Sequence, residues 1–419
     1  MHFFGAGVVD QVVLSGANFL AGLLMIRRTT DVDYGQFVLA QSAILLLVSV
    51  QASWLTGILA IIVPKKTPSE RTHAIGTMRV SQAKFLRRIA LALLLATAAA
   101  WLVGIIKPVI ALVTAGIMLA SWAALQREYL RSALIMHTRP SHLLQTDVVY
   151  AAFLIVGVLG ATYWAAWSGV FSIGALLVAA LIAAVFSYRA LDADPGWIAG
   201  DAKPLWQEVR KIGIWATVGS VIYWIFAQSY NYILASRFDL TAVASVNAAR
   251  LLLTPIFVFT IGINNVLITS TAKWLAAIGL SKTLRRLLLV LVIITALDLV
   301  YLAVLWSIRD WLVGSVLHKT IADRDTLLAL WAVIALIFLP REMIQAVLFA
   351  SGRMKSMTWV IAVSAVVSLS LTWYGVGRWG TAAVLIGQIA GEFVNVFVLS
   401  GMLWRLLRVQ RGEIPTTSS

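Results

Sequence analysis

The sequence contains no cysteine, which excludes disulfides, thiolate metal sites and cysteine nucleophiles. Charge is also scarce: 12% of the 419 residues are charged, against roughly 25% in soluble domains. The five histidines form no HxxxH or HExxH pattern, so we predict no metal site and no catalytic residues built on them. No glycine-rich phosphate loop follows a strand pattern, which excludes a nucleotide-hydrolysing pump. These absences disfavour a soluble enzyme.

Apolar residues are abundant instead, making up 61% of the chain, and its mean hydropathy is +0.90. Apolar runs of about 20 residues, the length that spans a bilayer core, recur from end to end. We therefore expect an all-α polytopic membrane protein with twelve transmembrane helices. They are expected near residues 6–26, 36–63, 84–106, 109–130, 143–164, 169–190, 210–235, 241–270, 284–307, 323–350, 356–376 and 379–405.

The net charge of +15 has a simpler explanation than nucleic-acid binding. With an even number of helices, one side of the membrane collects roughly three times as many Lys and Arg residues as the other. Excess basic residues mark cytoplasmic loops, so we place both the N-terminus and the C-terminus in the cytoplasm. No nucleic-acid partner is expected.

The chain divides into two similar halves. A polar cytoplasmic linker, 191–209, separates a six-helix lobe at 1–190 from a second at 210–409, followed by a cytoplasmic tail at 410–419. At one constant shift, Arg28 corresponds to Arg237 and Gln41 to Arg250, and REYLRSALIMHTR later pairs with REMIQAVLFASGR. Two parallel six-helix repeats around a central cavity are predicted, an arrangement suited to alternating access.

A polar stripe marks one face of the first helix, and a counterpart occurs near residue 220. Because their spacing is helical, these side chains share a face. We predict that they line the cavity, the alternative being helix-packing contacts between small and polar residues. The residues are Gln11, Ser15 and Asn18 in the first half, and Gln228 and Asn231 in the second.

Arg250 is the sharpest single signal, because it lies near the middle of an apolar helix, where a charge is costly. Asn247 shares its face, and Gln41 occupies the corresponding position in the first half. A guanidinium there suits an anionic substrate such as a phosphate. The alternative is a structural ion pair with an acidic residue of the bundle.

Three acidic residues lie within predicted helices: Asp10, Asp298 and Glu392. Buried carboxylates serve as H⁺ or Na⁺ sites, so these are the candidates for ion coupling. The alternative for Asp10 is that it lies near a helix end and is simply hydrated. The alternative for Asp298 and Glu392 is a structural role, either as the ion-pair partner of Arg250 or in a hydrogen bond to a neighbouring helix. Asp147 is interpreted as an interfacial charge at a helix N-terminus.

The two Arg-Glu pairs at 127–128 and 341–342 are predicted to be structural. We expect each to close its helix at the cytoplasmic face, where a basic side chain meets the helix C-terminus and anionic lipid. Gating by these pairs is the alternative. The basic segment 65–88 is expected to lie as an interfacial piece on the inner leaflet.

The pattern SGANFLAGLLMIRRTTDVDYGQFVLA resembles the start of Wzx-type polysaccharide flippases. That family belongs to the superfamily of multidrug and toxin extruders and lipid II flippases. Arg28 followed by Tyr34-Gly35-Gln36-Phe37 matches the family signature after helix 1, and REMIQAVLFASGRMKSM is similar to the end of its helix 10. Helix count and length agree along essentially the whole chain.

This resemblance implies a flippase for an undecaprenyl-diphosphate-linked oligosaccharide in the bacterial cytoplasmic (inner) membrane, serving exopolysaccharide or O-antigen synthesis. Membrane lipids, a polysaccharide polymerase and glycosyltransferases would be its partners. It would need no cofactor, apart from coupling to an H⁺ or Na⁺ gradient. The alternative is an ion-coupled multidrug or small-molecule antiporter of the same superfamily. A membrane-bound glycosyltransferase or polymerase is disfavoured, because a long outer loop and a catalytic acidic cluster are missing.

Overall fold

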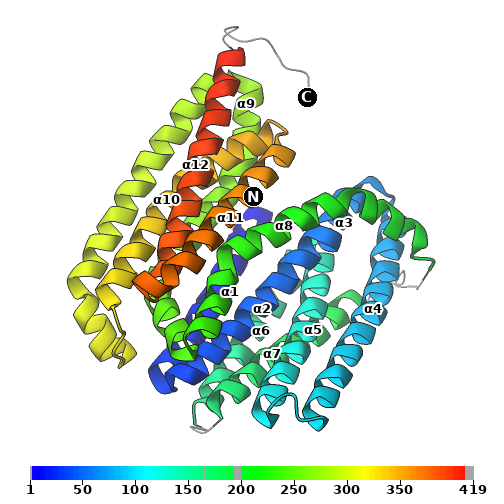
Figure 1. The fold of residues 1–419 in the computed structure, drawn as a ribbon. Helices are drawn as coiled ribbons and strands as arrows, with labels where there is room; N and C mark the ends of the chain where they lie inside the picture. Colours follow the sequence, from blue (N-terminus) through cyan, green and yellow to red (C-terminus); the bar gives the residue numbers. More distant parts are fainter. Residues whose placement is uncertain (1, 164–166, 193–199, 411–419) are drawn as a thin grey trace. The chain divides into compact units, whose positions relative to one another are not determined.

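A computed structural model gives the structure of residues 2–163, 167–192 and 200–410, which form helices and short connections (Figure 1). None of these residues lies in a strand. In chain order the elements are α1 (His2–Arg28), α2 (Asp31–Gln51), η1 (Ala52–Thr56), α3 (Gly57–Ile62), η2 (Val63–Lys65), α4 (Pro68–Leu102), α5 (Pro108–Met136), α6 (Pro140–Ala161), α7 (Ser168–Asp192), α8 (Lys203–Arg237), α9 (Leu240–Trp311), η3 (Leu312–Leu317), α10 (Arg324–Ala350), α11 (Met354–Trp379) and α12 (Ala382–Gln410).

The all-α polytopic class is confirmed. Within the described ranges, ten helical segments are long and apolar enough to cross a membrane. α8, bent by 61° between Lys211 and Ala216, makes an eleventh if it counts as one span. All twelve predicted segments fall on helices, with α2, η1 and α3 forming one continuous span. The orientation of the termini stays a prediction.

Local chemistry sets several helix starts. Thr30 caps α2 by accepting a hydrogen bond from the backbone N–H of Asp33 at 3.2 Å. Thr67 and Glu70 form a reciprocal capping box at the start of α4, and Pro68 occupies its first turn. The basic segment 65–88 is therefore continuous with the next span, and its predicted position at the inner leaflet stays a prediction. Its capping box starts a single 35-residue helix that continues into the next span.

Gly279 divides α9 into two spans. Its φ of 76° and ψ of 171° belong to a region that only glycine enters easily. Leu267 and Leu287, on opposite sides of Gly279, belong to one apolar cluster. In a straight helix they would lie ~30 Å apart at 1.5 Å per residue. The chain therefore folds back at Gly279, and no polar loop separates the two spans.

The chain forms two compact units, Met1–Val221 and Ile222–Ser419, referred to below as the first and second unit. The first has a core where Leu59 of α3, Met78 of α4 and Tyr129 of α5 are fully buried. In the second, Leu267 of α9 packs with Leu339 and Val347 of α10. The division falls inside α8, whereas the predicted linker was 191–209. Residues 193–199 and the tail from 411 lie outside the described residues, so the predicted lobe boundaries stay predictions.

Candidate functional site

The first unit brings together Asn18 of the predicted stripe and Gln41, the counterpart of Arg250. Gln41 of α2 donates a hydrogen bond from Nε2 to Oδ1 of Asn18 on α1, at 3.1 Å. Asn18 in turn donates from Nδ2 to the carbonyl of Leu14, at 2.9 Å. Ser15, on the same helix, is half-buried. The side chain of Gln11 lies outside the described part of the structure.

The second unit contains a larger group, the amide network, made of Gln228, Tyr230, Asn231, Asn247 and Arg250. Asn231 donates to Oε1 of Gln228 at 3.0 Å and accepts from Nδ2 of Asn247 at 2.6 Å. Tyr230 donates its hydroxyl to Oδ1 of Asn247 at 3.1 Å. Gln228, Asn231 and Asn247 are buried. The four predicted residues of this half therefore lie in one network, and Tyr230 joins them.

Arg250 ends this network as a half-buried cation. Its Nη1 donates to the Tyr230 hydroxyl at 3.3 Å, and its guanidinium carbon lies 5.5 Å from the ring centre of Trp331. Trp331 is itself fixed by a hydrogen bond from Nε1 to the carbonyl of Val246, at 3.0 Å. No carboxylate of the described residues forms an ion pair with Arg250. The alternative of a structural pair with Asp298 or Glu392 is therefore not observed.

A first arginine cluster lies inside the first unit and joins α1, α5 and α6. Arg127 donates to Asp147 at 2.5 Å and to Glu128 at 2.9 Å. Arg131 donates to the second oxygen of Asp147 at 2.8 Å and also to Asp10. Arg127 and Asp147 expose only 7% and 1% of their surface. The interpretation of Asp147 as an interfacial charge was wrong, because it is the buried acceptor for two guanidinium groups.

A second arginine cluster occupies the second unit and joins α9, α10 and α12. Arg341 donates to Glu392 at 2.6 Å and to Glu342 at 2.5 Å. Asn264 of α9 donates to the other oxygen of Glu342, at 2.5 Å. Arg341 exposes 1% of its surface and lies 4.5 Å from the ring centre of Phe338. Glu392, a predicted coupling residue, is thus the partner of a different arginine from the one expected.

The expectation that both Arg-Glu pairs close their helices at a membrane surface was also wrong. α5 continues beyond Arg127 to Met136, and α10 continues beyond Arg341 to Ala350. Both arginines are buried because each finds carboxylates on neighbouring helices, which offsets the cost of burying the charge. The duplicated REYL and REMI sequences marked these positions, but their buried partners gave no comparable signal.

Asp298 stands apart from both clusters. It exposes 3% of its surface, on the part of α9 that follows Gly279, and its Oδ2 has no hydrogen-bond partner among the described residues. Its helix neighbours Leu297, Leu299 and Val300 are at least half exposed. Of the three predicted coupling residues, it alone has no arginine partner.

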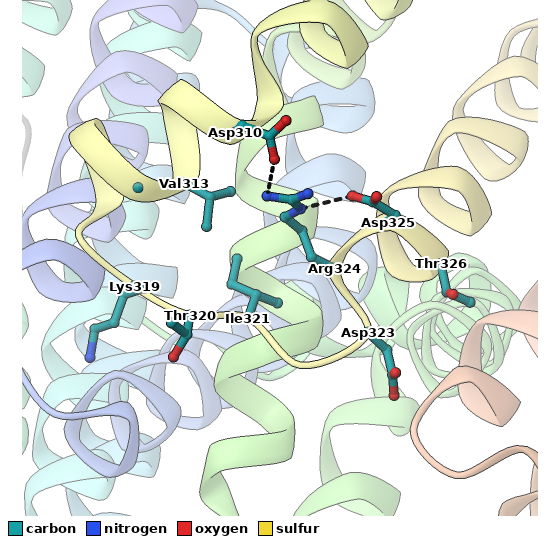
Figure 2. Close-up of a pocket in the computed structure, with 10 residues that line it drawn as sticks. Asp310, Val313, Lys319, Thr320, Ile321, Asp323, Arg324, Asp325 and Thr326 are labelled. Carbon is teal, nitrogen blue, oxygen red and sulfur yellow. Dashed lines mark hydrogen bonds and ion pairs between the residues drawn. The ribbon is translucent and has the colours of Figure 1, made fainter.

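A pocket of about 490 Å³ lies at the connection between η3 and α10 (Figure 2). Arg324 projects between Asp310 and Asp325 and forms a 2.8 Å ion pair with each. Arg309 also contacts Asp325, at 3.2 Å. These carboxylates are already neutralised, so the pocket is poorly suited to a cation. Among the described residues, no group of three or more His, Cys, Asp or Glu side chains could hold a metal ion.

Comparison with known proteins gives matches among solved structures only. No family model and no curated protein sequence matches the chain. An inward-facing multidrug resistance MATE family transporter of the MOP superfamily superposes with a TM-score of 0.79 at 13% identity, covering 97% of this chain and 96% of that one. An outward-facing structure of such a transporter gives 0.66 at 13% identity, covering 98% and 95%.

A third similar structure is a MOP superfamily transporter from Pyrococcus furiosus, described as having a binding pocket of reverse polarity that suggests a different function. Its TM-score is 0.68 at 12% identity, covering 97% of this chain and 95% of that one. At such identities the likeness establishes the fold alone. This chain therefore has the fold of MATE transporters of the MOP superfamily along essentially its whole length, whereas the narrower resemblance to Wzx-type flippases stays a prediction.

Proposed function

We propose that the protein is a secondary transporter that exports organic molecules by alternating access. The observation that carries this proposal is the likeness of nearly the entire chain to solved multidrug transporters. No nucleotide-binding loop is present in the sequence, so an ion gradient is the energy source. An enzymatic function has no support in the fold or in the side-chain clusters.

Of the two substrate classes that the sequence suggests, the small-molecule antiporter agrees better with these comparisons. Several of the matching structures are described as multidrug resistance or MATE transporters. Ion-coupled export of small organic molecules is therefore the leading form of the proposal.

Ion coupling is supported by the balance of charge in the two arginine clusters. In the first, Asp10, Glu128 and Asp147 face two guanidinium groups, and in the second, Glu342 and Glu392 face one. Each cluster thus holds one more carboxylate than it has arginines. Asp10 and Glu392 also each keep one buried oxygen without a hydrogen-bond partner among the described residues. A proton or small cation would balance either cluster.

The environment of Arg250 favours an anion as the transported molecule. Among the described residues its guanidinium contacts a neutral hydroxyl and an aromatic face and forms no ion pair, so its charge is available to a ligand. A structurally similar MOP superfamily transporter is described as having a binding pocket of reverse polarity that suggests a different function. Arg250 is also the observation that keeps the flippase as a second candidate, because a diphosphate is a strong ligand for a guanidinium.

As a flippase, the protein would bind the diphosphate at Arg250 and the sugars through amides such as Asn247 and Gln41. It would act in the bacterial cytoplasmic membrane beside a polymerase and glycosyltransferases. Localisation, lipid-linked substrate and partners all belong to this second candidate.

Replacing Arg250 by Gln tests both candidates at once. A charge-assisted hydrogen bond contributes about 1.5–3 kcal/mol, and about 1.4 kcal/mol corresponds to a tenfold change, so we expect at least a tenfold loss of transport. The measurements are gradient-driven efflux of anionic and cationic dyes from proteoliposomes, and surface polysaccharide in cells. Arg250→Lys should keep part of the activity, and Arg353→Gln, at an exposed position, should keep all of it.

The outcomes separate the candidates. Loss of anionic-dye efflux with unchanged polysaccharide identifies the antiporter, and loss of polysaccharide without dye transport identifies the flippase. Full activity of Arg250→Gln in both assays overturns the role of Arg250. Absence of transport by the wild-type chain in both assays overturns the proposed function.

A further inference from the structure

A lateral pocket of about 470 Å³ opens on the first unit between α4, α5 and α7. It shares no lining residue with the polar stripe or the first arginine cluster. Its walls differ in chemistry. One side carries Arg79, Lys84 and Arg87 of α4, and the other carries apolar side chains such as Leu181 and Val185 of α7. A cationic rim above an apolar wall matches an amphiphile with an anionic head.

The basic side is built by helix periodicity. Arg79, Ala83 and Arg87 recur every four residues, so they lie along one face of α4, with Lys84 beside them. Lys84 and Arg87 are exposed and form no ion pair with any described residue. No carboxylate lines the pocket. Among the described residues, no carboxylate therefore neutralises the charges of Lys84 and Arg87 at this rim.

Aromatic and amide groups complete the site. Arg79 stacks over the ring of Tyr188 at 4.0 Å, which links α4 to α7 at one end of the pocket. Trp122 and Gln126 of α5 also line it. Their N–H donors, Nε1 of Trp122 and Nε2 of Gln126, are buried and have no hydrogen-bond partner among the described residues.

The position along α4 suits a lipid headgroup. After Arg88 the exposed side chains of α4 become apolar, including Ile89, Leu91 and Leu95. The basic rim thus lies where the helix passes from the polar interface into hydrocarbon. The bias of basic residues predicts that this end of α4 is cytoplasmic, and the cytoplasmic leaflet carries anionic lipid.

We propose that the lateral pocket is a binding site for an anionic phospholipid of the cytoplasmic leaflet. The phosphodiester binds Lys84 and Arg87, beside the Arg79–Tyr188 stack, and one acyl chain lies against Leu181 and Val185. The site does not depend on which molecule the protein transports. A lipid in this pocket contacts both α4 and α7, beside the cation–π contact between Arg79 and Tyr188.

The test compares lipid retention on the purified full chain by native mass spectrometry, with phosphatidylglycerol and phosphatidylcholine of identical acyl chains as probes. Each basic residue near anionic lipid is worth about a fivefold change in affinity. Lys84→Ala/Arg87→Ala should therefore lower phosphatidylglycerol retention by about 25-fold. Arg87→Ala alone should lower it about fivefold. Arg88→Ala is the matched control for that single variant: it also removes one positive charge, from the neighbouring exposed position outside the pocket, and should change retention little.

A second variant separates a seated lipid from general electrostatic attraction. Val185→Trp fills the apolar wall from a position that is 48% exposed and leaves the charge unchanged. We expect it to reduce phosphatidylglycerol retention as well. Because these positions are exposed, thermal unfolding of the variants should match that of the wild type.

Several results would overturn the proposal. These are equal retention of phosphatidylcholine, an equal loss in Arg88→Ala and Arg87→Ala, or full retention in Val185→Trp. Displacement of the lipid by excess inorganic phosphate would show a site for free phosphate instead. Loss of transport in the Arg250 variants leaves the lipid result unchanged, so the two proposals fail independently.

Discussion

The two arginine clusters share a similar sequence motif, but their arginines pair with carboxylates from different helices. Arg127 and Arg341 are each followed by glutamate on a long helix, and each is buried. The main partner of Arg127 is Asp147 of α6, and that of Arg341 is Glu392 of α12. The first cluster also contains Arg131, whereas Gln345 stands four residues after Arg341 in the second. One motif has thus acquired carboxylates from two different neighbours.

This difference shows what the repeated motif determines. It places a guanidinium inside the bundle, where the cost of an unpaired charge requires a nearby carboxylate. It does not determine which helix supplies that carboxylate. The first cluster is redundant, because Asp147 keeps a second guanidinium if one is lost, and the second cluster is not. The predictions below test that redundancy.

The largest effect is expected for Arg341→Met. Its removal leaves the buried Glu392 and the half-buried Glu342 without the guanidinium that they share, and breaking a buried ion pair in this way costs about 3–5 kcal/mol. Equilibrium unfolding in mixed detergent micelles measures the loss in the free energy of unfolding. Arg353→Met, an exposed arginine of the same half, is the control and should change stability little. A loss no larger than that of the control would contradict the importance of the buried pair.

A smaller effect is expected for Arg127→Met. Asp147 still accepts a hydrogen bond from Arg131 at 2.8 Å, so its charge remains partly compensated. The expected loss in unfolding free energy is about 1–3 kcal/mol, clearly below that of Arg341→Met in the same assay. Arg88→Met supplies the exposed control in this half. If both buried variants lost the same stability, the redundancy of the first cluster would be refuted.

The smallest effect is expected for Asp10→Asn. The amide oxygen can still accept from Arg131, and removing the charge leaves two carboxylates facing two guanidinium groups. We expect a change of about 1 kcal/mol or less, measured as above. Glu392→Gln would leave Arg341 paired with Glu342 in the same way and provides the matched comparison. A loss from Asp10→Asn as large as that from Arg341→Met would show that the extra carboxylate is essential.

The fold was predictable because membrane spans are determined by local composition. The length and hydropathy of each segment placed all twelve helices, since every backbone polar group in hydrocarbon must be satisfied within a helix. Their limits were less predictable. The span predicted at 84–106 belongs to a longer helix, because the capping box at Thr67 starts α4 well before the apolar run. Gly279 gave no warning that two spans would be joined without a loop.

The candidate site residues were also predictable only in part. Helical spacing predicted which amides share a face, and the structure brings Asn231, Asn247 and Arg250 into one network. Pairing between distant helices was not predictable, because the Arg127–Asp147 and Arg341–Glu392 contacts depend on how the helices pack. A single sequence carries no local signal for that packing. Whether any of these residues contacts a transported molecule stays a prediction.

Gly279 also bears on how the chain enters the membrane. The spans on either side of it share one apolar cluster, and the residues that join them are helical except at Gly279. Lys273, Lys282, Arg285 and Arg286, which would retain this end on the cytoplasmic side, are carried by the helices themselves. During synthesis the pair would therefore insert as one hairpin rather than as two successive spans. Its closed end offers no loop for a protease or an inserted reporter.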